Sequence, residues 1–150
     1  MEAAAKHILV RARSGPAYWT VGCMFRFLVS SVDAGGSYTT MEITVPPGEG
    51  ANPHSHSAEE EQFYVLEGDL TFEVGGVEFS VGPGDFVHIP RGTVHSFKAA
   101  ERHARVLATF APGTGIEQVF IDAGELLSSE AAYSSAPPTA STGAPRHRAD

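Results

Sequence analysis

Three histidines and one glutamate form the most informative pattern in this sequence. His54 and His56 are separated by one residue, Glu61 follows five positions after His56, and His95 follows 34 positions after Glu61. On an extended strand, side chains two positions apart project from the same face, so His54 and His56 would act as a pair. Three imidazole nitrogens and one carboxylate oxygen suit a divalent first-row transition metal. The sequence therefore predicts a metal-binding function.

Neighbouring residues leave the set of ligands partly open. Glu59 and Glu60 are close enough in sequence to replace Glu61, although we expect both to face solvent. His88 lies in a short apolar segment ahead of His95, where it could line a pocket, hold a ligand by a hydrogen bond or serve only the fold. The other histidines have no comparable surroundings and are expected at the surface: His7, His103 and His147.

Composition restricts the fold and the partners. A chain of 150 residues fits one domain, and its 16 glycines and 10 prolines indicate the many turns of an all-β protein. The net charge of -8 argues against a nucleic acid or an anionic membrane as partner, because both require a basic surface. A small-molecule substrate is the partner that we expect.

The single cysteine and the hydropathy pattern bear on the compartment. Cys23 has no second cysteine to pair with, and its apolar neighbours predict a buried thiol. No apolar run approaches the roughly 18 residues of a membrane span, and residues 1–10 lack the apolar core of a secretory signal. We expect a cytoplasmic protein.

Short segments bounded by glycine and proline predict an antiparallel β-structure. Each contains apolar, β-branched and aromatic residues in alternation or in a run. The predicted strands are 8–13, 24–30, 37–45, 62–66, 70–74, 77–81, 86–89, 94–98 and 105–110. The clearest hairpin joins 70–74 to 77–81 through Gly75 and Gly76, and its register places all six apolar side chains on one face.

The chain divides into three predicted parts. Residues 1–19 form an N-terminal arm, and residues 20–127 form a β-barrel that ends with a short strand followed by a helical turn within 116–127. Residues 128–150 are rich in Ser, Ala, Pro, Thr and Gly. This composition predicts a disordered tail, because such a segment buries too little apolar surface to offset its ordering entropy.

Glycines and a proline frame the four donors at fixed spacing. The two stretches are Gly48-x5-His54-x-His56-x4-Glu61-x6-Gly68 and Gly84-x5-Pro90-x-Gly92-x2-His95. They resemble the paired motifs of the cupin superfamily, and the chain is most similar to its small single-domain members described as quercetin-dioxygenase-like. Ala99 departs from the pattern, since the second motif usually ends there with Asn. The resemblance implies a double-stranded β-helix, or jelly-roll barrel.

The resemblance also implies a site and an activity. It identifies His54, His56, Glu61 and His95 as ligands of one divalent ion, which could be Fe, Mn, Ni, Co or Zn, and it gives Glu61 a further role as catalytic base. Four ligands on an octahedral metal leave two positions for reactants, whereas four on tetrahedral zinc fill the shell. The implied protein is a homodimeric enzyme, most simply a dioxygenase, acting on a small aromatic or polyketide-like molecule. Two alternatives are a non-redox cyclase, isomerase or lyase and a non-catalytic binding protein.

Aromatic residues suggest where a substrate would bind. A set of apolar side chains could line a cavity that holds a flat organic molecule, although packing of the core would explain the same residues. The set consists of Phe25, Phe27, Met41, Phe63, Phe72, Phe97 and Phe110.

Overall fold

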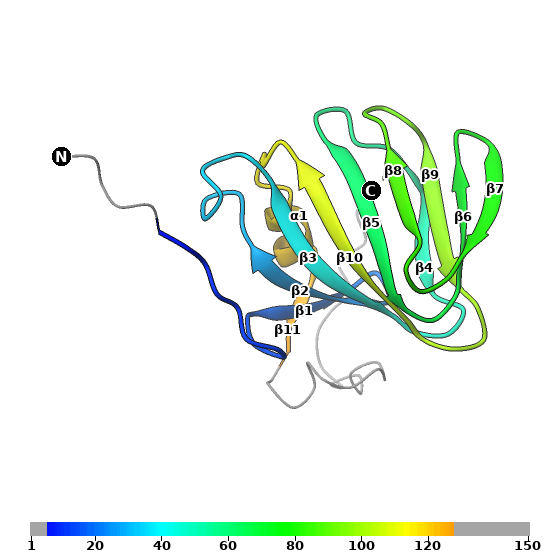
Figure 1. The fold of residues 1–150 in the computed structure, drawn as a ribbon, viewed down its shortest axis with the longest axis horizontal. Helices are drawn as coiled ribbons and strands as arrows, with labels where there is room; N and C mark the ends of the chain where they lie inside the picture. The colour runs from blue at the N-terminus through cyan, green and yellow to red at the C-terminus, as the bar shows by residue number, and fades with distance from the viewer. Residues whose placement is uncertain (1–5, 128–150) are drawn as a thin grey trace.

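Two antiparallel β-sheets packed face to face make up the protein (Figure 1). The structure, a computed structural model, describes residues 6–127. The predicted disordered tail, 128–150, lies outside the described residues, as do the first five residues of the predicted arm.

The larger sheet has seven strands, and every neighbouring pair is antiparallel. In spatial order they are β11 (Glu125–Leu126), β1 (Ala17–Thr20), β2 (Cys23–Val29), β3 (Thr39–Val45), β10 (Ala104–Ala111), β5 (Glu60–Glu67) and β8 (Phe86–Ile89). The smaller sheet has four strands, in the order β4 (Gly50–His54), β9 (His95–Ala99), β6 (Leu70–Val74) and β7 (Val77–Val81). This arrangement is the predicted jelly roll.

The core fills the space between the two sheets because several strands, among them β5, β6, β8, β9 and β10, alternate buried and more exposed positions. In β10, for example, Ala104, Val106, Ala108 and Phe110 are buried while the residues between them are partly exposed. Burial of each large apolar side chain contributes about 1.5–3 kcal/mol, so a core of this kind supplies most of the stability. The largest fully buried side chains come from both sheets: Phe63, Phe72, Phe110, Met41, Ile43 and Leu70.

The hairpin of β6 and β7 has the predicted register. Val74 pairs with Val77, and the pairing continues outward to Leu70 opposite Val81. Gly75 and Gly76 have φ of 56° and 83°, the left-handed conformation that a two-residue turn of type I′ requires at both positions.

Three sequence-based expectations about the elements were wrong. Residues 8–13 form no strand; Ile8 and Leu9 are 49% and 65% exposed, and no described strand pairs with them. Strand β1 begins at Ala17, inside the segment assigned to the arm. Within 116–127 the helix α1 (Glu117–Ala123) comes first and the strand β11 second. Apolar residues of β-type form a strand only where a partner strand completes the hydrogen bonds.

Helix α1 is held at its ends and contributes no fully buried residue of its own. The Glu117 carboxylate accepts hydrogen bonds from the Ser31 backbone N–H at 2.8 Å, the Ser31 hydroxyl at 2.8 Å and the Thr39 hydroxyl at 2.9 Å. Beyond the other end, β11 pairs with β1. This seven-residue helix is the only one among residues 6–127, and it is too short to cross a membrane.

Candidate metal centre

The four predicted donors meet at one end of the barrel, and they come from both sheets. His54 is the last residue of β4 and lies opposite His95, the first residue of β9, in the smaller sheet. His56 follows β4 by two residues, and Glu61 is the second residue of β5 in the larger sheet. One ligand atom from each residue lies within 4.8 Å of the others.

Backbone carbonyls orient two of the imidazole rings. The Nδ1 atom of His54 is 2.7 Å from the Asn52 carbonyl oxygen, and Nδ1 of His95 is 2.8 Å from the Thr93 carbonyl oxygen. An Nδ1–H that donates to a carbonyl leaves the Nε2 atom to face the site, and this arrangement orients many metal-bound histidines. The local backbone therefore presents Nε2 as the ligand atom.

The carboxylate of Glu61 lies between two of these rings. Its Oε2 atom is 2.9 Å from Nε2 of His95 and 3.2 Å from Nε2 of His56. Burial disfavours the Glu61 anion, but its close contacts with His56 and His95 and their positive charge outweigh burial and lower the pKa of Glu61. Burial likewise disfavours charged His95, yet its bonds to Glu61 and Thr93 raise the pKa of His95. The site stabilises positive charge beside an anionic carboxylate.

At His54, unlike His95, the effect of burial on the pKa prevails. It lowers the pKa of His54, and the nearby His95 and His56 lower it further, against the raising effects of the bond to Asn52 and of Glu61. A neutral imidazole is the form that binds a metal, so His54 is prepared to act as a ligand.

One buried atom has no hydrogen-bond partner among the described residues, and it is Nε2 of His56. Although Nε2 lies 3.2 Å from Glu61, the contact lacks hydrogen-bonding geometry. A buried polar nitrogen without a partner is costly, and a metal ion is the ligand that would satisfy it. The donor set, its mutual distances and this unpartnered nitrogen fit a divalent transition metal.

The neighbouring candidates do not join the cluster. Glu59 is buried rather than solvent-exposed as expected, because its carboxylate accepts a hydrogen bond from the Thr114 hydroxyl. Glu60 is half-buried, and its carboxylate is 4.0 Å from the Arg91 guanidinium. His88 is exposed and lies opposite Gln62 on the outer face of the larger sheet.

An apolar cavity of about 360 Å³ adjoins the donors. Three of the seven residues proposed from the sequence line it, namely Phe25, Phe97 and Phe110, whereas the others pack only in the core. Sequence reasoning missed Phe120, which lines the cavity from α1, because the predicted helical turn gave no direction for its side chains. The remaining lining residues are Val21, Ile43, Gly50, Ala51, Asn52, His54, His56, Glu61, Ile116 and Val119.

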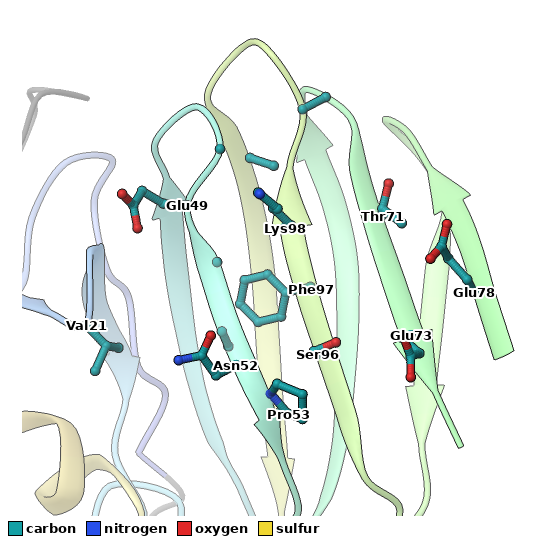
Figure 2. Close-up of a pocket in the computed structure, with 15 residues that line it drawn as sticks. Val21, Glu49, Asn52, Pro53, Thr71, Glu73, Glu78, Ser96, Phe97 and Lys98 are labelled. Atoms are coloured by element: carbon teal, nitrogen blue, oxygen red, sulfur yellow. The ribbon is translucent and has the colours of Figure 1, made fainter. Parts of the chain in front are cut away.

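A larger hollow, of about 690 Å³, lies on the outer face of the smaller sheet and contains none of the four donors. Figure 2 shows Thr71 and Glu73 on β6 and Ser96 and Lys98 on β9 along this surface. Alternation places these polar side chains on the face opposite the core. The larger hollow is thus separate from the candidate chemistry.

Two antiparallel sheets that enclose a His₃Glu cluster define a jelly-roll protein with a candidate metal site. The family model described as "Cupin domain" matches residues 41–110, a range that includes all four donors. This match shows that residues 41–110 form a cupin domain.

Three similar proteins illustrate the range of the family. Quercetin 2,3-dioxygenase of Bacillus subtilis is 30% identical over 90 residues, which are 60% of this chain and 27% of the dioxygenase. The chain thus spans about a quarter of that relative. A predicted oxalate decarboxylase of Thermotoga maritima has a TM-score of 0.64 at 21% identity, covering 70% of this chain and 99% of that one. The polyketide cyclase RemF of Streptomyces resistomycificus has a TM-score of 0.54 at 26% identity, covering 74% and 80%.

Proposed function

We propose that this protein is a metal-dependent cupin enzyme that oxygenates a small aromatic or polyketide-like molecule. His54, His56, Glu61 and His95 hold one divalent transition metal, and the substrate binds in the adjoining apolar cavity. The observation that carries the proposal is the position of the unpartnered Nε2 atom of His56, which is buried beside Glu61 where the donors meet the cavity.

The chemistry follows from the donor set. A redox-active metal held by His54, His56, Glu61 and His95 would supply a Lewis acid and the means to activate dioxygen. The protein orients the rings of His54 and His95 through the carbonyls of Asn52 and Thr93. The apolar walls limit the access of water to the reacting atoms.

Glu61 acts as the proton acceptor in this proposal. Its pKa is lowered, so the carboxylate is ionised near neutral pH. A low pKa also makes it a weak base, and it therefore accepts a proton only from a substrate group that is itself acidic, such as a phenol or enol polarised by the cation. Glu61 is 3% exposed, and burial strengthens its interaction with such a group.

The walls of the cavity favour an aromatic substrate over a small dianion. Phe25, Phe110 and Phe120 face the space, and no Lys or Arg is among the lining residues. A dicarboxylate such as oxalate would gain nothing from these phenyl rings and would find no Lys or Arg side chain in the cavity. A flat organic molecule with one polar edge buries its rings and directs that edge to the donors. This reasoning favours the type of substrate implied by the dioxygenase and the cyclase.

A non-redox reaction is the second candidate function. The similarity to a polyketide cyclase, which extends over 80% of that chain, supports it. In a cyclase, isomerase or lyase the same donors would hold a Lewis acid that polarises a carbonyl group, with Glu61 again accepting the proton. Dioxygen would have no part in such a reaction.

Elemental analysis and an oxygen-dependent assay test the proposal. The purified protein is expected to contain one divalent metal ion per chain, and turnover of a panel of hydroxylated aromatics with one ring or two fused rings is expected to consume dioxygen. Turnover that is undiminished under anaerobic conditions would eliminate the oxygenase and support the cyclase. A protein without stoichiometric metal, and inactive after reconstitution with each candidate metal, would contradict both.

We also propose that the protein is a homodimer. Tyr64 and Phe86, 46% and 58% exposed, lie opposite each other on the outer face of β5 and β8. Exposed aromatic side chains side by side are typical of contact surfaces. Light scattering is expected to give twice the chain mass for the wild type and the chain mass for Phe86→Glu. A monomeric wild type would contradict this proposal.

A further inference from the structure

Helix α1 forms a wall of the cavity without being part of the core. None of its residues is fully buried, yet the helix and the residue before it bring Ile116, Val119 and Phe120 to the cavity. The bonds of Glu117 fix its beginning, and the pairing of β11 with β1 fixes the chain after its end. The position of the helix therefore does not depend on the Phe120 side chain alone.

A series of ring contacts connects the donors to this wall. The ring centroids of His56 and Phe110 are 5.3 Å apart with an angle of 90° between the planes. Phe110 and Phe120 follow at 6.3 Å, and Phe120 stacks on Phe25 at 4.4 Å with an angle of 24°. Two successive contacts thus separate a donor histidine from Phe120, and the third holds the Phe120 ring against β2.

The size of the cavity limits what fits between the donors and Phe120. At about 360 Å³ it is near the lower end of the range typical of ligand pockets, roughly 300–1,000 Å³. Its sides are formed by strands of the two sheets, whose core residues cannot move without cost. Phe120 is half-buried and lies on a helix that contributes no fully buried residue, so a single substitution of Phe120 can enlarge the cavity.

We propose that Phe120 determines which substrates the site accepts. It admits flat molecules with one ring or two fused rings and excludes larger ones. This inference rests on the proposed function, since it concerns the same site, and it adds the size class of the substrate and the residue that sets it. The Phe120 ring contacts the edge of the ligand that lies farthest from the donors, while the polar edge of the ligand faces His54, His56 and Glu61. Phe25 holds the Phe120 ring in place by stacking.

A series of hydroxylated arenes tests the inference through binding rather than turnover. Phenol, 2-naphthol and 2-anthrol, with one, two and three fused rings, are titrated by calorimetry into the protein as purified and after treatment with a chelator. We expect the wild type to bind 2-naphthol at least about tenfold more tightly than 2-anthrol. Phe120→Ala reverses this order, and Phe120→Trp weakens 2-naphthol about tenfold or more relative to phenol.

Matched variants exclude a general effect on the fold. Phe79→Ala removes another half-buried phenylalanine, from β7, which does not line the cavity, and it should leave the order of affinities as in the wild type. If Phe120→Ala unfolds, Phe120→Leu and Phe120→Trp carry the test, since both keep an apolar side chain on α1. An order that is the same in the wild type and the Phe120 variants, or no binding of any arene by the wild type, would overturn the inference. Metal content, measured on the same samples, decides separately whether the proposed metal site exists.

Discussion

Replacing two of the donor histidines, one at a time, should separate metal binding from folding. His95 is 2% exposed and is bonded to Glu61, which is 3% exposed, whereas His54 is only partly buried and bonded to a neighbouring carbonyl. His95→Ala leaves the buried carboxylate with His56 as its one remaining partner. His54→Ala leaves the pair of Glu61 and His95 intact. Both variants should lose stoichiometric metal, but only His95→Ala should strongly destabilise the metal-free protein.

The size of the difference follows from the burial of the partners. Removing one member of a buried charged pair costs about 3–5 kcal/mol. Removing a partly exposed hydrogen bond costs about 1 kcal/mol. For a chain of 150 residues each kcal/mol corresponds to roughly 2–4 °C in Tm, so His95→Ala should lower the Tm of the metal-free protein by about 6–20 °C and His54→Ala by about 4 °C or less.

Thermal unfolding of chelator-treated protein, together with elemental analysis of untreated protein, provides the measurement. His7→Ala is the matched control, because His7 is exposed and belongs to neither sheet, so this substitution should change neither quantity. Equal losses of Tm in His54→Ala and His95→Ala would refute the energetic reasoning. Stoichiometric metal in either variant would refute the assignment of that histidine as a ligand.

Four further substitutions test other parts of the fold and site. Burial raises the pKa of Glu117, but hydrogen bonds outweigh it and lower this pKa. The carboxylate therefore stabilises the fold above pH 4.5, its unfolded pKa, and this contribution is lost as the pH falls through the lower pKa of the folded state. Glu117→Gln should flatten this acid limb of the plot of Tm against pH. In Gly50→Ala the new Cβ would overlap the Phe97 carbonyl, so β4 should separate from β9. Because His54 and His95 lie on these two strands, the purified variant should contain less metal than the wild type. Full metal content would contradict the pairing. Glu42→Gln should cost about 3 kcal/mol in denaturant unfolding, because Arg26, 7% exposed, then loses its only carboxylate partner among the described residues. Arg26→Met should cost about 1 kcal/mol, because Glu42 keeps Arg105 as a guanidinium partner. The reverse order would contradict this reasoning.

The sequence predicted best where local and long-range signals agree. The hairpin of β6 and β7 combines strict alternation with a Gly75–Gly76 turn, so its register was predictable to the residue. The four donors were predictable because their spacing is fixed within two framed motifs, and the structure brings them within 4.8 Å of one another.

The errors arise where a partner far along the chain decides the outcome. Residues 8–13 have the composition of a strand, but no described strand pairs with this segment, whereas the short β1 forms because β2 and β11 lie on either side of it. The turn between β1 and β2 gave little signal, because Val21 adopts a φ of 45°, which is rare for a β-branched residue. The burial of Glu59 depends on Thr114, 55 positions away. None of these contacts is encoded in a local pattern.

The position of the donors on both sheets has a mechanical consequence. A cation coordinated by all four would connect β5 of one layer to β4 and β9 of the other, by bonds that no apolar contact between the layers replaces. Sliding or separation of the layers at that end would then require release of the ion. Amide hydrogens at the beginnings of β5 and β9 should therefore exchange in a single concerted event in the loaded protein, and independently once the ion is withdrawn.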